Sequence, residues 1–210
     1  KIISPMELIL IINIFFISID FEIVYWQTMK LKYLSQIKLA LELNMPGFLL
    51  SHRYLINSDI DPSGAKPLYF AILEYPSSVK TLLNMGADPN VAVQKGLTPL
   101  HYAAKMHDSS VVEALLWAGA NPQSIMDEGE FKKLTPILLL LVEYFNNEDN
   151  AAKQKKIVEV AKIIVAKLKP EHTFDKASLL NYARNNRLDA LSFLIEVGFD
   201  INESIDVDND

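Results

Sequence analysis

Hydrophobic and polar positions follow a helical period over most of the chain, and one stretch shows this period best. Val111, Val112, Leu115 and Leu116 occupy positions i, i+1, i+4 and i+5, which places them on one face of a helix. Gly119, which follows, is typical of the residue just past a helix C-terminus, where a left-handed backbone is favoured. The stretch therefore predicts an amphipathic helix that buries one face.

A second helix is predicted immediately before it. Thr98 is a good N-cap residue, and Pro99 suits the first turn because its φ angle is already helical. Ala103 and Ala104 are small enough to let this helix approach a neighbour closely. His107 stands where the helix should end. The two predicted helices form one helix-turn-helix unit.

Similar units recur along the chain, with Gly86 and Gly119 lying 33 residues apart. An earlier copy begins near Lys66, a later one near Thr135, and a fourth ends near Gly198. The third copy has Lys167 where the second has Gly119, and about eleven extra residues between its helix motifs, which predicts a longer helix or an altered ending. A divergent first unit spans residues 33–62. Because no unit can bury its apolar face alone, the copies are expected to stack.

Residues 98–104 read TPLHYAA, which closely resembles the T-P-L-H-x-A-A motif of the ankyrin-repeat family. The V-V-x-x-L-L run at residues 111–116 and the G-A-N sequence at 119–121 are similar to that family as well. The resemblance covers roughly residues 33–202. It implies an all-α solenoid of about four repeats with a divergent N-terminal cap, and it implies that His101 braces the turns by hydrogen bonding.

The predicted organisation has three parts. A hydrophobic N-terminal segment of uncertain structure occupies residues 1–28, an ankyrin-repeat domain residues 29–202, and an acidic C-terminal tail residues 203–210. The repeats are expected near residues 33–62, 64–95, 96–128, 133–172 and 176–202.

The N-terminal segment contains an apolar run at residues 8–19 that the repeats do not explain. Twelve residues are too few to cross a bilayer as a helix, which takes roughly 20, and no small-x-small cleavage site follows. Three interpretations stay open: a packed or irregular apolar segment, a membrane anchor or signal, and a mis-assigned start. The last rests on the first residue being Lys1, with Met6 and Met29 as candidate initiators.

The composition, 50% hydrophobic and 22% charged, is that of a folded chain. The absence of cysteine excludes disulfides and thiolate metal sites, and it is compatible with the cytoplasm or another reducing compartment, including a host cytosol reached by secretion. The net charge of −6 disfavours nucleic acid as a partner.

No arrangement of polar residues in the sequence predicts catalysis. His107, Asp108 and Ser109 are neighbours in a predicted loop, whereas catalytic triads are assembled from distant positions. Residues 59–64 match the first half of an EF-hand loop, but position 12 of that loop is Phe70, which offers no carboxylate. We therefore expect no catalytic residue, no metal and no cofactor.

The resemblance places partner binding on the inner helices and the turn tips. The position after the motif histidine holds Phe70, Tyr102 and Leu139 in successive copies, which predicts an apolar stripe. The alternative is that Leu139 belongs to the core of a very apolar helix. The candidate partner-binding residues are Phe70, Leu73, Tyr102, Lys105, Met106, Leu139, Glu143 and, in the long turn tip at residues 123–133, Phe131.

The second helix of the third copy is predicted to be basic. This fits a solvated face, and it also fits docking to an acidic partner or to lipid headgroups. The lysines concerned are Lys153, Lys155, Lys156, Lys162, Lys167 and Lys169.

The sequence thus predicts a non-catalytic module that binds another protein through a concave groove and turn tips. One alternative is a membrane-tethered ankyrin protein held by residues 1–28. Another is the targeting portion of a larger enzyme or of a secreted microbial effector.

Overall fold

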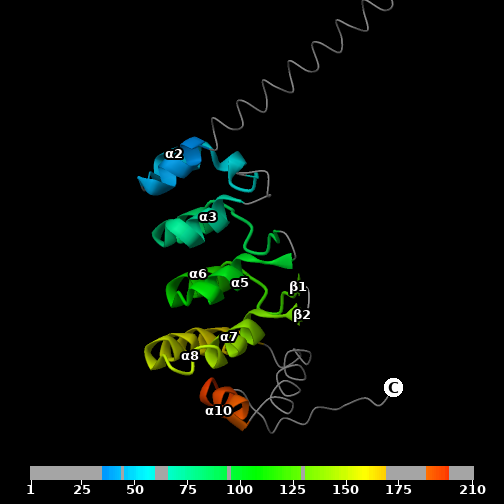
Figure 1. The fold of residues 1–210 in the computed structure, drawn as a ribbon. Helices are drawn as coiled ribbons and strands as arrows, with labels where there is room; N and C mark the ends of the chain where they lie inside the picture. The colour runs from blue at the N-terminus through cyan, green and yellow to red at the C-terminus, as the bar shows by residue number, and fades with distance from the viewer. Residues whose placement is uncertain are drawn as a thin grey trace, which may run out of the picture.

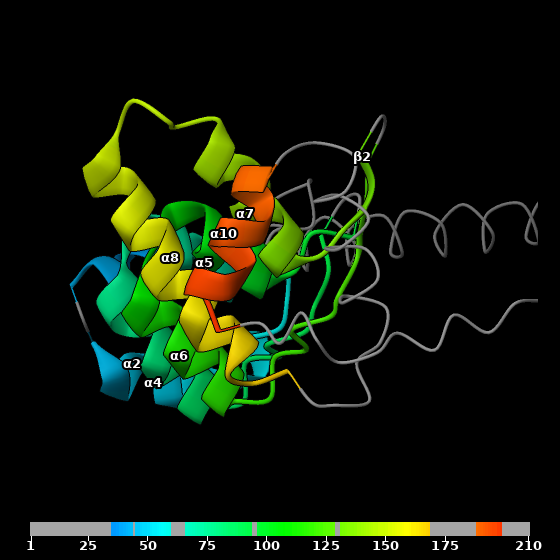
Figure 2. The same ribbon diagram turned by 90° about the horizontal axis from the view of Figure 1, so that it is seen from below.

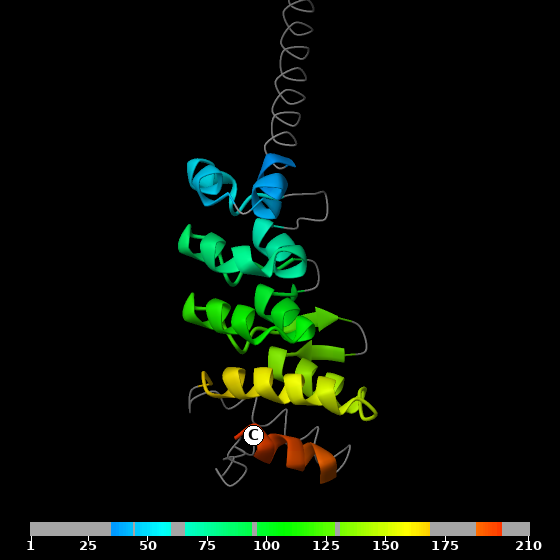
Figure 3. The same ribbon diagram turned by 90° about the vertical axis from the view of Figure 1, so that its left-hand side faces the viewer.

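The computed structural model describes residues 35–43, 45–59, 66–93, 96–128, 131–168 and 188–198, and only the backbone of residues 127–128, 131–133 and 188–191. The hydrophobic segment over residues 1–28 and the acidic tail over 203–210 lie outside the described residues. In the described part, pairs of helices form successive layers of one stack, from α2 at one end to α10 at the other (Figures 1 and 3).

Three layers are complete helix pairs. They are α3 (Pro67–Glu74) with α4 (Val79–Asn84), α5 (Pro99–Met106) with α6 (Ser109–Trp117), and α7 (Pro136–Phe145) with α8 (Ala151–Val165). The first helices contact one another in the order α3, α5, α7, and the second helices in the order α4, α6, α8. We call the first set the inner helices and the second set the outer helices. The predicted all-α solenoid of helix-turn-helix units is confirmed.

Shorter elements complete the stack. A helix over residues 35–42, α2 (Pro46–Ser51) and the 3-10 helix η1 (Arg53–Leu55) precede it, and α10 (Leu188–Glu196) follows it. A second 3-10 helix, η2 (Pro76–Ser78), leads into α4. The strands β1 (Met126–Glu128) and β2 (Phe131–Leu134) form an antiparallel hairpin that lies to one side of the helices (Figure 2). The long turn tip predicted at residues 123–133 is this hairpin.

The inner helices begin alike because each has proline at its first position: Pro67, Pro99 and Pro136. Proline fits there since its missing N–H has no partner within a helix and its φ angle is preset. Thr135 also caps α7, where its hydroxyl accepts a hydrogen bond from the Leu138 N–H at 3.4 Å. The local sequence therefore sets where each layer starts.

One continuous apolar core runs through the layers. It begins at Ile37 in the first unit and continues to Phe193 in α10. Ala71, Ala103 and Ala161 are completely buried, as expected for small residues where helices pack closely. In α10, the Phe193 ring lies 4.8 Å from the Tyr144 ring of α7, centroid to centroid, which extends the core into the last layer.

The helix ends confirm the left-handed backbone predicted after the outer helices. Gly86 and Gly119 have φ angles of +95° and +89°, the left-handed backbone predicted for residues that follow a helix. His107 ends α5 in the same region, with φ +53°. Tyr75, at the end of α3, has a φ of −135° instead. The shorter turn of that copy continues through Pro76 into η2 and needs no left-handed residue.

The third layer is longer, as predicted from Lys167, but the extra residues are not mainly between its helices. α7 has 10 residues where α5 has 8, and α8 has 15 where α6 has 9. The connecting loop, residues 146–150, gains only three over residues 107–108. Most of the insertion therefore extends the two helices.

Within the described residues, no helix is both long enough and apolar enough to cross a membrane.

Candidate functional site

The inner helices bring three predicted partner-binding residues into register. Phe70, Tyr102 and Leu139 lie at the same position of α3, α5 and α7, and each is half-buried. Leu139 is therefore neither fully buried core nor freely exposed, in contrast to its completely buried neighbour Leu140. The predicted stripe exists as a half-buried apolar row along the inner helices.

Aromatic contacts hold this row in place. The Tyr102 ring meets the Tyr69 ring edge-on at 5.1 Å, and the Phe70 ring lies 5.5 Å from Tyr75. The ammonium of Lys38, on the helix over residues 35–42, lies 4.7 Å from the centre of the Phe70 ring, within cation–π range. The row is thus pre-organised rather than loosely attached.

The side chains most available to a partner flank this row. Leu73 is 43% exposed and Met106 is 50% exposed, and Lys105 is also exposed. Glu143 is half-buried, and its Oε2 lies 3.6 Å from the Nζ of Lys153 on α8. Phe131 belongs to strand β2, but its side chain is outside the described part of the structure.

His101 braces the turn below it, as the motif resemblance implied. Its Nε2 lies 3.1 Å from the carbonyl oxygen of Leu134 and must donate, because a carbonyl oxygen only accepts. Nδ1 therefore accepts, from the Thr98 hydroxyl at 2.8 Å and the Thr98 N–H at 3.3 Å. His101 is completely buried, and burial lowers the pKa of its imidazole while the Leu134 bond opposes this more weakly. The ring is a neutral structural link between repeats.

Tyr69 takes the place of this histidine in the preceding repeat. Its hydroxyl lies 2.6 Å from the carbonyl oxygen of Leu97, which precedes Thr98 just as Leu134 precedes Thr135. The carbonyl oxygen of Val91 lies 2.5 Å from the same hydroxyl. Burial raises the pKa of the Tyr69 hydroxyl well above its ordinary range, so it remains a donor. The same backbone position is thus braced by a different side chain.

Asparagines link the turns that follow successive outer helices. Asn57 donates from Nδ2 to the Gly86 carbonyl oxygen and accepts from the Asp88 N–H, both at 2.9 Å. Asn90, 33 residues later, makes the same two bonds to Gly119 and Asn121, at 2.9 and 2.7 Å. This asparagine ladder fixes the spacing of the layers and thereby the surface they present.

Polar residues considered for catalysis have structural roles. Asp108 caps α6, where its Oδ1 accepts from the Ser110 N–H, the Ser110 hydroxyl and the Val111 N–H. Asp59 pairs with Lys66, and the rest of the EF-hand-like stretch, residues 60–64, lies outside the described residues. Among the described side chains, no three potential metal ligands cluster.

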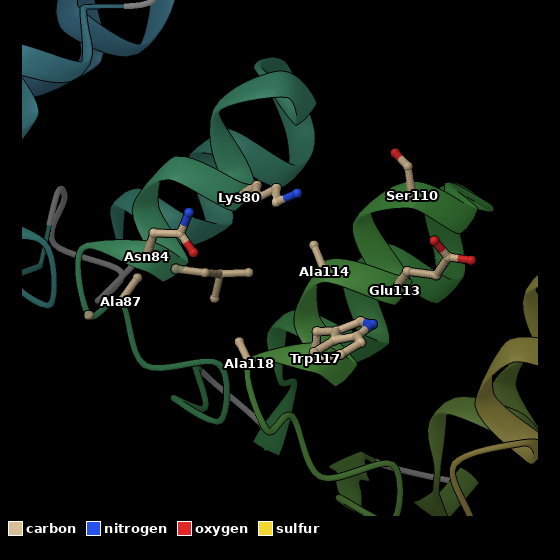
Figure 4. Close-up of a pocket in the computed structure, with 10 residues that line it drawn as sticks. Lys80, Asn84, Ala87, Ser110, Glu113, Ala114, Trp117 and Ala118 are labelled. Atoms are coloured by element: carbon tan, nitrogen blue, oxygen red, sulfur yellow. The ribbon is translucent and has the colours of Figure 1, made fainter.

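Sequence reasoning missed Trp117, the most exposed large hydrophobic side chain among those described, at 84%. It lies at the end of α6 on the outer side of the stack, and the Nζ of Lys167 lies 5.5 Å from its ring centre. Beside Trp117, a groove of about 810 Å³ lies between α4 and α6 (Figure 4). The helical period could have found Trp117, because it falls on the face opposite Val111, Val112 and Leu115.

Comparison with known proteins matches the centre of the stack. Residues 68–116 fit a family model described as "Ankyrin repeats (many copies)". A curated protein of Acanthamoeba polyphaga mimivirus, described as a "putative ankyrin repeat protein", is 38% identical over 79 residues. The match covers 36% of this chain and 19% of the mimivirus protein, so the chain spans about a fifth of the length of this curated relative.

Proposed function

Because the chain is an ankyrin-repeat protein, we propose that it is a non-catalytic module that binds a partner protein along its inner helices and turn tips. Ankyrin repeats generally mediate protein–protein interaction and are typically non-catalytic. The observation that supports this surface is the apolar row along the inner helices, flanked by the exposed side chains of Leu73 and Met106.

The row combines rigidity with accessible apolar area. Half-buried aromatic rings give a partner large contact surfaces that lose little conformational entropy on binding. Met106 adds an adaptable side chain, which suits apolar contacts of irregular shape. Lys105 places a charge at the edge, where it can influence partner choice more than affinity.

The best substitutions are at the exposed flanking residues. Phe70 and Tyr102 pack against the core, so truncating them would also affect stability. A Leu73→Asp, Met106→Asp double variant puts charge on the surface without removing core contacts. The matched control is Leu50→Asp with Ile195→Asp, two other apolar residues that are each 57% exposed but lie on α2 and α10.

The test is capture of partner proteins from an extract of the cells that make this protein, with the full chain as bait. The inner-helix double variant should retain about a tenth or less of the captured partner, the loss expected for two hot-spot residues. The control should capture as much as wild type, with equal helicity for all three. Equal capture by wild type and the inner-helix variant would place the site elsewhere.

The membrane-tether alternative depends on residues 1–28, which lie outside the described residues. It stays a prediction, as do the effector role and a cytoplasmic or other reducing location. Fractionation of the full chain beside a chain that starts at Met29 tests the tether, because only a real anchor makes the longer chain sediment with membranes.

A further inference from the structure

The outer helices carry a charge balance opposite to that of the chain. The whole chain has a net charge of −6. In α4, α6 and α8, together with Lys167 just after α8, lysines outnumber glutamates by six to two. They are Lys80, Lys153, Lys155, Lys156, Lys162 and Lys167, against Glu113 and Glu159. Lys153 pairs with Glu143 of α7, and Lys155 and Lys162 line a separate pocket together with Glu159 and Glu196. The lysines near α4 and α6 are therefore Lys80, which lines the groove between these helices, and Lys167. Two lysines against Glu113 give this part of an acidic protein a positive balance, which favours an acidic partner there.

Trp117 lies beside Lys167 and lines the same groove as Lys80. An indole that is 84% exposed adds nothing to the core, whereas tryptophan is among the residues most often found as a binding hot spot. Lys167 approaches its ring from the α8 side. On the other side the ring borders the groove between α4 and α6.

The groove is suited to an apolar side chain. Small residues leave it open: Ala114 lines it from α6, Ala118 follows α6, and Ala87 follows α4 (Figure 4). Its rim is polar, with Lys80 on α4 and Glu113 on α6. Among the described residues, neither of these two has an ion-pair partner. Its volume, about 810 Å³, is ample for one or two large side chains.

We propose that these outer helices form a second docking surface, which binds an acidic amphipathic segment of a partner protein. An apolar side chain of that segment enters the groove against Trp117, and its carboxylates pair with Lys80 and Lys167. Glu113 lies at the same rim and opposes the negative charge. A purely electrostatic ligand such as nucleic acid or an anionic bilayer would need the lysines but not the groove. This surface is separate from the inner helices and does not rest on their role.

The test measures binding of a labelled acidic peptide to the full chain by fluorescence anisotropy. The probe is a helical peptide of about 14 residues with leucine at every third or fourth position and glutamate at most others. A peptide with glutamine in place of every glutamate is its matched control. Binding should weaken by about tenfold between 50 and 300 mM NaCl, because salt screens exposed charges. The glutamine peptide should bind at least about tenfold more weakly.

Variants of the protein locate the site. Trp117→Ala should weaken binding by about 10- to 30-fold, as expected for a hot spot. Lys80→Gln and Lys167→Gln should each weaken it by about threefold, and Glu113→Gln should tighten it by about twofold. Tyr54→Ala and Arg53→Gln, an exposed aromatic and an exposed cation on η1, should leave it unchanged.

Three results would overturn the proposal. The first is equal binding of the glutamate and glutamine peptides. The second is binding that Trp117→Ala does not alter. The third is tighter binding of phosphatidylserine vesicles or single-stranded DNA than of the peptide, with the same dependence on lysines and none on Trp117.

Discussion

Single side chains connect the repeats by satisfying backbone groups of the next layer. His101 and Tyr69 differ in chemistry, yet each donates to the carbonyl oxygen that precedes the next inner helix. Leu138, at the same position of α7, is buried and apolar and offers no donor. Each bond joins one repeat to the next, so these two side chains contribute a hydrogen bond between layers as well as their own packing.

His107 is a strained residue within this framework. It is the one non-glycine residue with a positive φ in the described part of the chain, and its Nε2 is buried there without a hydrogen-bond partner. A residue with a β-carbon in the left-handed region costs roughly 1–2 kcal/mol, while glycine pays only its extra freedom in the unfolded chain. The position is therefore open to improvement.

His107→Gly should raise the free energy of unfolding by about 0.5–1 kcal/mol, because it removes both the backbone strain and the unsatisfied nitrogen. Urea unfolding followed by circular dichroism measures the change. His107→Ala is the control, since it removes the ring but keeps the β-carbon. A glycine variant no more stable than the alanine variant would show that backbone strain is not the cause.

The buried histidines also make stability depend on pH. Burial lowers the pKa of His101 and of His107 below the ordinary value of 6.5; at His107 the charges of Lys153 and Lys156 lower it further, against an opposing effect of Glu143. As the pH falls below 6.5, the unfolded chain binds a proton that the folded chain does not, so stability is lost. Above 6.5 both states are neutral and no loss occurs.

Lowering the pH from 7.5 to 5.5 should therefore reduce the free energy of unfolding, by at most about 1.4 kcal/mol per histidine, since 5.5 is one unit below 6.5. His101→Gln should show a smaller reduction because glutamine can donate and accept without titrating. Urea unfolding at both pH values makes the comparison. Identical losses of stability in wild type and in His101→Gln would exclude His101 as a source of the pH dependence. Ordinary carboxyl groups titrate mainly below pH 5.5 and contribute little to the comparison.

At the level of elements, the asparagine ladder sets how one turn lies on the next. Asn57 and Asn90 each make two bonds into the following repeat. The corresponding position in the next repeat is Gln123, whose Nε2 is buried and lacks a hydrogen-bond partner in the described structure. The asparagine ladder therefore does not continue into the third layer, which has Lys167 at the position of Gly86 and Gly119.

Asn90→Ala should lower the free energy of unfolding by about 1–2 kcal/mol, since two hydrogen bonds are lost at an exposed turn. The matched control is Asn84→Ala on the exposed side of α4, which should change stability by less than about 0.5 kcal/mol. Thermal or urea unfolding distinguishes them. Equal effects of the two substitutions would mean that the ladder does not stabilise the stack.

The sequence could predict those helix ends that depend only on residues within the same turn. Thr98, Pro99 and Gly119 act within one turn, so the ends of α5 and α6 could be predicted. Tyr75 could not, because its backbone depends on a shortened turn that enters η2. The helical period places Trp117 on the outward face of α6, but how far its side chain is exposed depends on the neighbouring layers. The groove beside it exists only once α4 and α6 are stacked.

At the scale of the whole molecule, stacking produces two unlike surfaces. The inner helices present a pre-organised apolar row with few charges, whereas the outer helices present an exposed tryptophan beside Lys167 and a groove that Lys80 also lines. Both are made by the same continuous core, so a ligand on either surface stabilises the whole stack by binding the folded state. Protein partners are expected to bind along the inner helices.

Site-specific photo-crosslinking tests that claim most directly. A benzoylphenylalanine placed at Met106 of the full chain should crosslink to a partner protein in cell extract, because that side chain lies at the edge of the apolar row. The same group at Ile195, which is similarly exposed on α10, is the control. We expect a crosslinked band from position 106 that is absent from position 195 and is reduced by Leu73→Asp. A band of equal strength from both positions, or none from position 106, would contradict it.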